Sequence, residues 1–488
     1  MQNRTRTGFA SLIGLGISAL VFSVGLLLVP NLAHAAEKPN VLFIAVDDMN
    51  HDLGTFGHPL VKSPNIDRLA KSGVQFDRAY CQFPLCAPSR ASVMTGLRPD
   101  TVQVFDLTTT FRKALPDQVS LSQLFINNGY YAARVGKIYH YQVPGDIGKD
   151  GLDDRKSWNH KVNPIGRDRA DKKLVTNLTP GRTLGIGLDY LRSEAADEEL
   201  TDGKVATETI KLLEANKDKP FFIAAGFYLP HLPFIAPKKY FDLYPIEKVQ
   251  VPKGPFDYMK DLPVGVMSMR PWPWMGVTET QARDAVQGYW ASISYVDAQI
   301  GRLLDAVERL GLAKNTIIVF WSDHGYHTGE HGLLKKQSLF ENSARSPLII
   351  AHPGAKNKGK STRRIVEFID IYPTLAELAS LTPPKNLEGK SLKPLLDNPT
   401  AKWDRPAFTQ VWRASYPGHS VRTDRYRYTE WDNGKQGAQL YDYTTDPEEK
   451  RNLINDPKHA KVVSELRDLV RKNWANEYRP IVKTALNE

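Results

Sequence analysis

The chain has 488 residues, of which 41% are hydrophobic and 24% are charged, proportions typical of a folded globular protein and not of a disordered one. Its 64 basic residues outnumber the 54 acidic ones, giving a net charge of +10, and it contains only two cysteines. This cysteine count excludes a disulfide framework. The basic residues form no cluster interleaved with aromatics, so we expect no nucleic-acid partner and instead a diffuse positive bias that attracts anionic substrates.

The first 35 residues have the pattern of a signal peptide. Arg4 and Arg6 precede an apolar run over residues 12–29, and Ala33-His34-Ala35 supplies a small-x-small cleavage site. We therefore expect a cleaved signal and an exported protein, periplasmic or secreted. Because the apolar run approaches the length of a membrane span, an uncleaved N-terminal anchor is the alternative. No later stretch is long and apolar enough to predict stable membrane insertion.

Short apolar runs without polar alternation are typical of strands buried on both faces. Four such runs occur, at Asn40–Val46, Pro220–Gly226, Thr316–Trp321 and Ser346–Ala351. Helical patterns lie between them, at Leu121–Asn128, Thr201–Asn216 and Thr280–Leu310. Strands that alternate with helices predict an α/β fold whose sheet is covered by helices on both sides.

Polar residues follow two of these runs directly. Asp47 and Asp48 come after the first run, and Asp323 and His324 come after the third. Ligands in open α/β sheets bind beyond the carboxyl ends of the strands, so we expect these side chains to converge. For either pair alone, a helix N-cap is the alternative. Carboxylates gathered in one place repel one another unless a cation holds them, and oxygen ligands suit calcium or magnesium.

Residues 83–101 predict a loop that becomes a short helix. Pro88 suits the first helical turn, and Gly96 followed by Pro99 suits the helix end. Cys86 is thus expected just ahead of a helix N-terminus, where the dipole favours an anion, and Arg90 adds a positive charge one turn inside. The alternative is an ordinary buried cysteine.

This stretch resembles the sulfatase signature at six positions, namely Cys86, Pro88, Ser89, Arg90, Thr95 and Gly96. The likeness extends over nearly all of the mature chain. It points to the formylglycine-dependent sulfatases of the alkaline-phosphatase-like superfamily, with the iduronate-2-sulfatase branch as the nearest match. The resemblance implies that a formylglycine-generating or sulfatase-maturing enzyme oxidises Cys86 to formylglycine, an aldehyde whose hydrate attacks sulfur.

The resemblance also implies the architecture. We expect a large mixed, mostly parallel sheet sandwiched by helices over residues 36–398, after the signal peptide at 1–35. A smaller C-terminal α+β subdomain with an antiparallel sheet is expected over 399–488. Within it, alternation over Tyr426–Trp431 indicates a strand, and Asp432-Asn433-Gly434 indicates the following turn.

By the same resemblance, the metal is calcium, with magnesium as the alternative. Its implied ligands are two strand-end pairs and the modified nucleophile: Asp47, Asp48, Asp323, His324 and an oxygen at position 86. Many sulfatases carry Asn where this chain has His324, and the His variant resembles the iduronate-2-sulfatase branch.

The remaining site residues are also assigned by resemblance. Lys137 and His140 lie in a second sulfatase signature over residues 128–140. Lys137 would contact a sulfate oxygen, His140 would remove a proton from the sulfated hydrate, and Arg90 would hold the oxygens of the hydrate. His231 and Lys336 would protonate the departing sugar oxygen. Lys335 is the neighbouring alternative to Lys336, but the spacing from Asp323 favours Lys336.

The expected activity is therefore hydrolysis of O-sulfate esters on a sulfated oligosaccharide or polysaccharide, with iduronate 2-sulfate or a related uronate or sugar 2-O-sulfate as the candidate substrate. Leu229 and Ile235 stand where iduronate-2-sulfatases carry basic residues, which weighs against iduronate itself. Tyr326, His327 and Thr328 are expected to line the mouth of the pocket. The alternatives are a phosphoesterase or phosphonate monoester hydrolase on the same scaffold, and an inactive carbohydrate-binding relative.

Overall fold

The computed structural model describes residues 38–413 and 416–475. The signal peptide predicted over residues 1–35 lies outside the described residues. No helix within the described stretches combines the length and the apolar character needed to cross a bilayer.

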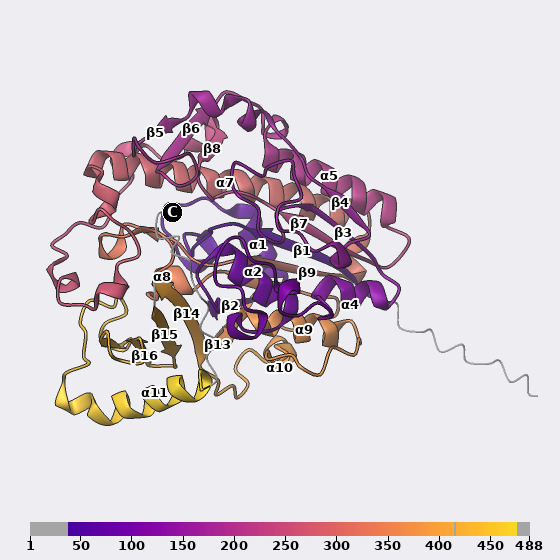
Figure 1. Cartoon of the computed structure of the whole chain (residues 1–488). Helices are drawn as coiled ribbons and strands as arrows, with labels where there is room; N and C mark the ends of the chain where they lie inside the picture. The colour runs from indigo at the N-terminus through magenta and orange to yellow at the C-terminus, as the bar shows by residue number, and fades with distance from the viewer. Residues whose placement is uncertain (1–37, 414–415, 476–488) are drawn as a thin grey trace, which may run out of the picture. The chain divides into compact units, whose positions relative to one another are not determined.

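A central sheet of eight strands runs in the order β13-β2-β12-β9-β1-β7-β3-β4 (Figure 1). The strands are β1 (Asn40–Val46), β2 (Val74–Tyr80), β3 (Tyr131–Gly136), β4 (His160–Val162), β7 (Phe221–Gly226), β9 (Thr316–Ser322), β12 (Leu348–Ala351) and β13 (Lys360–Glu367). Only β12 is antiparallel to its neighbours in this sheet. The prediction of a mixed, mostly parallel sheet is confirmed.

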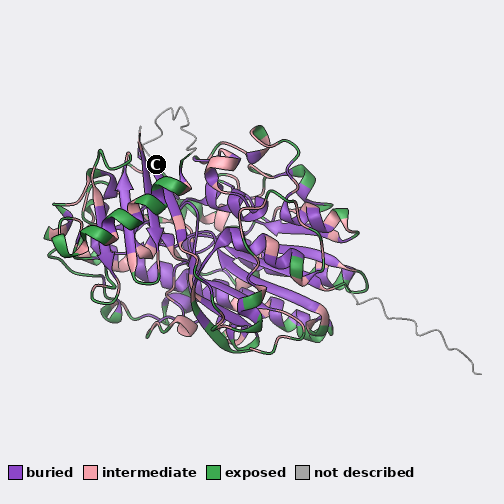
Figure 2. Cartoon of the chain, turned by 90° about the horizontal axis from the view of Figure 1, so that it is seen from below, coloured by how far each residue is buried: buried purple, intermediate pink, exposed green. Residues whose placement is uncertain are grey.

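Helices cover this sheet on both sides, as predicted. Figure 1 shows α5 (Thr201–Asn216) and α7 (Glu279–Arg309) on one side, and α4 (Leu121–Asn127) and α9 (Ile371–Leu378) on the other. Every residue of β1, β7 and β9 is consequently buried, which explains why their sequences are continuously apolar. Figure 2 shows strands inside the molecule largely in purple, the colour of buried residues. The other helices are α1 (Pro64–Ser72), α2 (Cys86–Thr95), α3 (Pro99–Val102), α6 (Lys238–Phe241), α8 (Glu341–Ala344), α10 (Lys393–Asp397) and α11 (Ala460–Asn473).

Strand register brings the predicted site residues to one edge of the sheet. β1 and β9 are parallel neighbours with Val46 opposite Ser322, so the residues that follow them emerge side by side. β3 and β7 are also parallel to this pair, with Gly136 opposite Gly226. The carboxyl ends of four adjacent strands therefore form the edge on which a ligand would bind.

Near the C-terminus, four antiparallel strands form a separate small sheet: β14 (Ala407–Arg413), β15 (Tyr416–Arg422), β16 (Tyr426–Trp431) and β17 (Ala438–Asp442). Asp432 and Asn433 adopt positive φ of 47° and 54°, as the predicted turn requires. α11 contacts β15 and β16. The boundary predicted at 398/399 stays a prediction.

The described residues also form two further small sheets. One contains β5 (Thr176–Asn177), β6 (Asp189–Ser193) and β8 (Phe234–Pro237), and the other pairs β10 (His327–Thr328) with β11 (Leu334–Lys335).

Candidate active site

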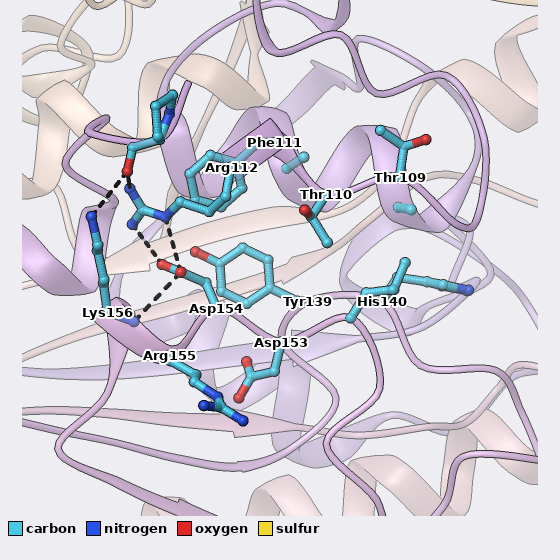
Figure 3. A pocket seen from close by; sticks show the side chains of 14 residues that line it. Thr109, Thr110, Phe111, Arg112, Tyr139, His140, Asp153, Asp154, Arg155 and Lys156 are labelled. Atoms are coloured by element: carbon cyan, nitrogen blue, oxygen red, sulfur yellow. Dashed lines mark hydrogen bonds and ion pairs between the residues drawn. The ribbon is translucent and has the colours of Figure 1, made fainter. Parts of the chain in front are cut away.

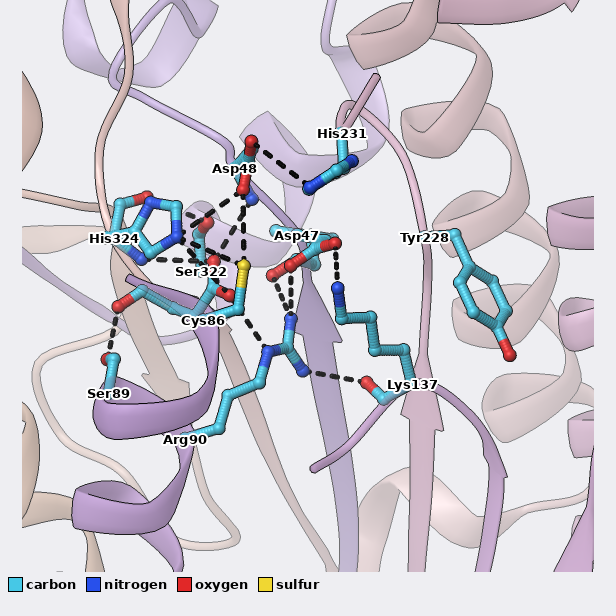
Figure 4. A network of polar contacts seen from close by, with 12 residues as sticks. Asp47, Asp48, Cys86, Ser89, Arg90, Lys137, Tyr228, His231, Ser322 and His324 are labelled. Carbon is cyan, nitrogen blue, oxygen red and sulfur yellow. Dashed lines mark hydrogen bonds and ion pairs between the residues drawn. The ribbon is translucent and has the colours of Figure 1, made fainter. Parts of the chain in front are cut away.

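Cys86 is the first residue of α2, one position further into the helix than the sequence predicted. The helix ends at Gly96, whose φ of 69° is the left-handed conformation expected at that position. The Cys86 side chain is buried, and its Sγ lies 3.1 Å from Lys336 Nζ, 3.5 Å from His324 Nε2 and 3.7 Å from Asp48 Oδ1 (Figure 4). The structure thus places the sulfur among charged groups and not in an apolar interior.

The Cys86 thiol is a poor nucleophile in its unmodified form. Burial, followed by the charge of Asp47, raises the pKa of the thiol well above its ordinary value, although Lys336 and Lys137 oppose this shift. A thiol reacts through its thiolate, so a neutral Cys86 would attack a sulfate or phosphate ester slowly.

The two strand-end pairs converge as predicted. Two overlapping groups of side chains each have their potential ligand atoms within 4.8 Å of one another. The first group is Asp48, Cys86, Asp323 and His324, and the second is Asp47, Asp48, Cys86 and His231. Asp48 has a φ of 66°, a strained conformation for a residue with a side chain. Tyr289 on α7 stabilises it, because its hydroxyl donates to the Asp48 carbonyl at 2.8 Å.

Arg90 ties two of these carboxylates together. Its Nη2 lies 3.1 Å from Asp47 Oδ1, and its Nε lies 2.9 Å from Asp323 Oδ2. Its other N–H groups donate to the backbone carbonyls of Val46, Lys137 and Ile138. All five donors of the buried guanidinium therefore have acceptors, and Arg90 fixes the positions of Asp47 and Asp323.

Two buried lysines neutralise the remaining carboxylate charge. Lys137 Nζ lies 2.5 Å from Asp47 Oδ2, and Lys336 Nζ lies 2.6 Å from Asp48 Oδ1. Burial opposes ionisation of Asp48, but His231, Lys336 and other neighbours lower its pKa to about 2. Burial likewise opposes the charge on Lys336, yet Asp48 and its other anionic neighbours raise its pKa well above the ordinary value. Asp48 and Lys336 are both charged at neutral pH.

The hydrogen bonds of the two histidines near Asp48 define their tautomers. His324 Nδ1 lies 2.9 Å from the Gly325 carbonyl, and His231 Nδ1 lies 2.6 Å from the Leu232 carbonyl. A carbonyl only accepts, so each Nδ1 carries a proton and each Nε2 is the ring nitrogen that is left to face the site. The Nε2 of His324 faces Cys86 and Asp48, and that of His231 lies 4.0 Å from Asp48 Oδ2.

His140 differs from these histidines because neither of its ring nitrogens has a hydrogen-bond partner among the described residues. Burial, reinforced by Lys137, lowers the pKa of His140 well below its ordinary value. The imidazole is therefore neutral and free to accept a proton.

Asp202 and the backbone of the His231 loop form a contact that the sequence did not predict. Asp202, in the first turn of α5, is buried and accepts the backbone N–H groups of Tyr228 and Leu229, both at 2.9 Å. The His231 N–H in turn donates to the Tyr228 carbonyl. Asp202 thereby fixes the loop that carries His231. Asp202 lies 29 residues from His231 in a helical pattern, and no local signal marks it.

Tyr326, His327 and Thr328, which were predicted to line the mouth of the pocket, are all buried, and their place at a pocket mouth stays a prediction. Tyr326 is 2% exposed and stacks on Tyr289 with ring centroids 4.7 Å apart, and His327 is fully buried against Ser338. Both rings pack against aromatic neighbours, Tyr289 for Tyr326 and Phe340 for His327.

A cavity of about 460 Å³ adjoins the site through Ala87 and His140 (Figure 3). The Arg112–Asp154 ion pair lies on its wall, with Nη2 and Oδ2 2.7 Å apart. Its lining includes His140 but not Cys86 or the carboxylates around it, so this cavity does not contain the cluster around Cys86.

The donor set fits a hard divalent cation. The carboxylates of Asp47, Asp48 and Asp323 and an imidazole nitrogen lie close together around Cys86. Figure 4 shows Asp48 and His324 next to the sulfur. Carboxylate oxygens are the ligands that calcium and magnesium prefer, and the orientation of His324 directs its Nε2 toward the same position. A bound cation would also relieve the repulsion between these carboxylates.

Comparisons with known proteins agree with this geometry. The family model described as Sulfatase matches residues 39–381, and the model described as N-sulphoglucosamine sulphohydrolase, C-terminal, matches residues 329–476.

Individual proteins match over most of their length. A sulfatase of Formosa agariphila is 35% identical to this chain, covering 90% of this chain and 87% of its own length. Iduronate 2-sulfatase of Mus musculus is 31% identical, and the match covers 89% of this chain and 94% of that protein. The crystal structure of a phosphonate monoester hydrolase of Agrobacterium radiobacter superposes with a TM-score of 0.75 at 23% identity, covering 90% of this chain and 96% of that one. This last likeness concerns the fold.

Proposed function

We propose that this chain, which belongs to the sulfatase family and is a sulfuric ester hydrolase, cleaves O-sulfate esters of a sulfated carbohydrate. The proposed reaction uses a formylglycine at position 86 and a calcium ion. The observation that carries the proposal is the position of Cys86 Sγ, within 3.7 Å of Lys336, His324 and Asp48. His324 and Asp48 follow the carboxyl ends of β9 and β1.

The proposed substrate is a sugar that bears a 2-O-sulfate, such as a sulfated uronate within an oligosaccharide or polysaccharide. The likeness to iduronate 2-sulfatase over 89% of the chain supports this class. Leu229 and Ile235, apolar residues on either side of His231, offer no charge to a uronate carboxylate and favour a sugar other than iduronate itself.

The proposed metal ligands are Asp47, Asp48, Asp323, His324 and the oxygen that oxidation introduces at position 86. When bound there, calcium would supply a fixed positive charge for the sulfate oxygens and for the reacting oxygen. Arg90 maintains the spacing of Asp47 and Asp323, so it acts on the ion through the carboxylates. Magnesium is the alternative, because the same oxygen ligands accept it.

The chain's own residues supply the rest of the proposed reaction. Oxidised to formylglycine, position 86 provides a hydrated aldehyde whose hydroxyl attacks sulfur, as in the family. Lys137, which pairs with Asp47, would hold a sulfate oxygen. His140, which is neutral and has no hydrogen-bond partner within the described part of the chain, would take the proton that must leave the second hydroxyl for sulfate to depart.

Lys336 and His231 are the proposed proton donors to the departing sugar oxygen. Burial lowers the pKa of His231 to about 4, although Asp48 opposes this, so the histidine is neutral before substrate binds. Lys336 keeps its proton and is the donor that is ready in the free enzyme. A positioned acid of this kind is worth roughly 10²–10⁴ in rate.

A phosphoesterase or phosphonate monoester hydrolase is the second candidate, because a protein of that activity shares the fold. An inactive carbohydrate-binding relative would lack site residues, and none of the ten predicted ones is missing from this chain. The structure moreover brings nine of the ten into one hydrogen-bonded or close-contact cluster, with His140 beside it.

Two measurements test the proposed function. Peptide mass spectrometry of the native protein should find the aldehyde in place of the Cys86 thiol. Parallel assays should give a higher kcat/KM for an aryl sulfate than for the matching aryl phosphate. A preference for phosphate would reject the sulfatase assignment.

The metal is tested separately. Exhaustive chelation should abolish turnover and lower the midpoint of thermal unfolding, because the carboxylates then repel one another, and calcium should restore both. Restoration by magnesium but not by calcium would reassign the ion.

A further inference from the structure

Lys335 is a buried cation beside the site to which the proposed reaction gives no task. Its side chain is 5% exposed, and its Nζ donates to the Ile186 carbonyl at 2.7 Å. Among the described residues this carbonyl is its one hydrogen-bond acceptor, and no carboxylate lies within ion-pair distance. Two of its three N–H donors are therefore without a partner.

A buried ammonium with a single acceptor is costly, since burial of a charge is normally compensated by an opposite charge. Burial and the neighbouring Lys336 lower the pKa of Lys335 to about 8, so the side chain is still largely protonated at neutral pH. An anion that binds next to Lys335 would remove this cost.

The backbone around Lys335 is also strained. His331, Lys335 and Gln337 have φ of 59°, 72° and 69°, in the left-handed region that residues with a side chain rarely adopt. Each such conformation costs on the order of 1 kcal/mol or more and persists where the surrounding structure imposes it, often at ligand sites. In this segment the strained conformations occur where the chain places two adjacent lysines, Lys335 and Lys336, at the site.

Charged groups around Lys335 show where its ammonium lies. Asp48 and Lys336 are close enough to influence its pKa, as are Arg182 and Asp189. Asp189 does not pair with Lys335: its Oδ2 accepts the Gly185 N–H, and its Oδ1 has no partner in the described chain. Lys335 and Arg182 thus add positive charge next to the cluster of Asp48, Lys336 and Cys86, and Asp189 leaves a free acceptor.

We propose that Lys335 is a specificity-determining residue that binds a second anionic group of the sugar, either a carboxylate or a further sulfate, while the reacting sulfate lies at position 86. The inference rests on the proposed function and deepens it: the preferred substrate is a sugar with two negative charges. Asp189 Oδ1 would accept a hydroxyl of the same sugar.

The experiment compares kcat/KM for three glycosides: a 2-O-sulfated uronate, a disulfated neutral hexose, and a 2-O-monosulfated neutral hexose as the reference. The wild type should prefer at least one doubly charged sugar over the reference. Lys335→Met, of similar length without the charge, should reduce that preference by roughly 10-fold or more, mainly through KM, because a charge-assisted hydrogen bond is lost. The uronate and the disulfated hexose distinguish a carboxylate from a sulfate as the recognised group.

Two further variants serve as controls. Lys335→Arg keeps the charge and should retain most of the preference. Lys173→Met removes the same charge from an exposed position and should leave all three values unchanged, which excludes an effect of net charge.

The outcomes are distinguishable. If Lys335→Met lowers kcat/KM equally for all three sugars, or leaves the preference intact, Lys335 has a structural role and the inference is overturned. A wild type without any preference for a second charge also overturns it. If the correctly oxidised wild-type enzyme hydrolyses none of the sulfates, the proposed function itself fails.

Discussion

At the scale of single residues, the nucleophile gives the sharpest prediction. Cys86→Ser should be almost inactive in multiple turnover, because a serine sulfate ester has no second hydroxyl through which to expel sulfate. The expected product is protein that carries one sulfate group, visible by intact mass spectrometry after incubation with an aryl sulfate. Peptide analysis must verify that position 86 is still serine.

Cys86→Ala is the matched control, since it removes the nucleophile and little core volume. Its thermal midpoint should stay close to that of the wild type, and it should not gain sulfate. Steady multiple turnover by the serine variant would contradict the hydrate mechanism.

Arg90 carries the second prediction at this scale. Arg90→Lys keeps the charge but cannot reach both Asp47 and Asp323 together with three carbonyls. Breaking such a buried network costs about 3–5 kcal/mol, and we expect that loss in urea unfolding together with a fall in kcat/KM of at least ~100-fold. Arg68→Lys, at an exposed ion pair with Asp305, should cost about 1 kcal/mol or less. Equal losses in the two variants would show that Arg90 does not organise the carboxylates.

The sequence predicted the convergence of Asp47, Asp48, Asp323 and His324 because a physical rule connects strand ends to one sheet edge. It did not predict that every donor of Arg90 would be occupied, or that Tyr289 would hold Asp48. Those contacts join residues more than forty positions apart, and the side chains that make them have no distinctive spacing. Individual contacts across a site thus depend on packing that only the folded chain defines.

At the scale of elements, continuous apolar runs predicted β1, β7 and β9 to within one residue. The same criterion missed β3, which contains Arg134. Arg134 is fully buried in the sheet because Asp153, from a later loop, pairs with it at 2.8 Å. A buried ion pair hides a strand from a search for apolar residues, since the compensating charge lies elsewhere in the chain.

Asp202 gives a prediction about how α5 and the His231 loop respond to pH. Burial raises its pKa to about 7, although the N–H groups of Tyr228 and Leu229 oppose the shift. The native state therefore binds a proton that the unfolded chain, with a pKa of about 3.9, releases. Protonated Asp202 therefore adds up to about 4 kcal/mol to the free energy of unfolding. This contribution is fully present below about pH 4 and is lost as the pH rises through about 7.

Asp202→Asn should remove that pH dependence. In urea unfolding at pH 5 and pH 8, the wild type should lose more stability on going to pH 8 than the variant does. The other titrating groups are common to both proteins and cancel in the comparison. Parallel losses would mean that Asp202 is ionised at both pH values and that its two N–H contacts outweigh burial.

At the scale of the whole molecule, the small C-terminal sheet takes part in building the site. Its strand β14 binds the segment that leads to Cys86: the Gln410 N–H donates to the Gln82 carbonyl at 2.9 Å, and the Thr409 hydroxyl donates to the Cys81 carbonyl at 2.8 Å. The resemblance predicted a separate subdomain here, but no sequence pattern indicated this contact, because it joins residues over 300 positions apart.

A shared apolar cluster strengthens this connection. Buried side chains from the nucleophile loop, from the segment after Lys336 and from the small sheet pack together, namely Phe83, Leu85, Phe340, Val411, Trp431 and Tyr441. Because the loop that positions Cys86 forms one face of this cluster, we expect the large domain and the small sheet to unfold as a single cooperative unit.

Trp431→Ala tests this coupling. Trp431 is 1% exposed, so its truncation should destabilise the protein by about 3–5 kcal/mol. The urea midpoint measured by far-UV circular dichroism and that measured by sulfatase activity should fall together, because the loss at the small sheet is transmitted to the nucleophile loop. Leu469→Ala, at a side chain 38% exposed on α11, should change the free energy of unfolding by no more than about 0.5 kcal/mol, so both midpoints should stay close to those of the wild type. If activity instead persisted beyond a separate early transition in the circular dichroism signal, the small sheet would be an independent unit and Cys86 would be positioned without it.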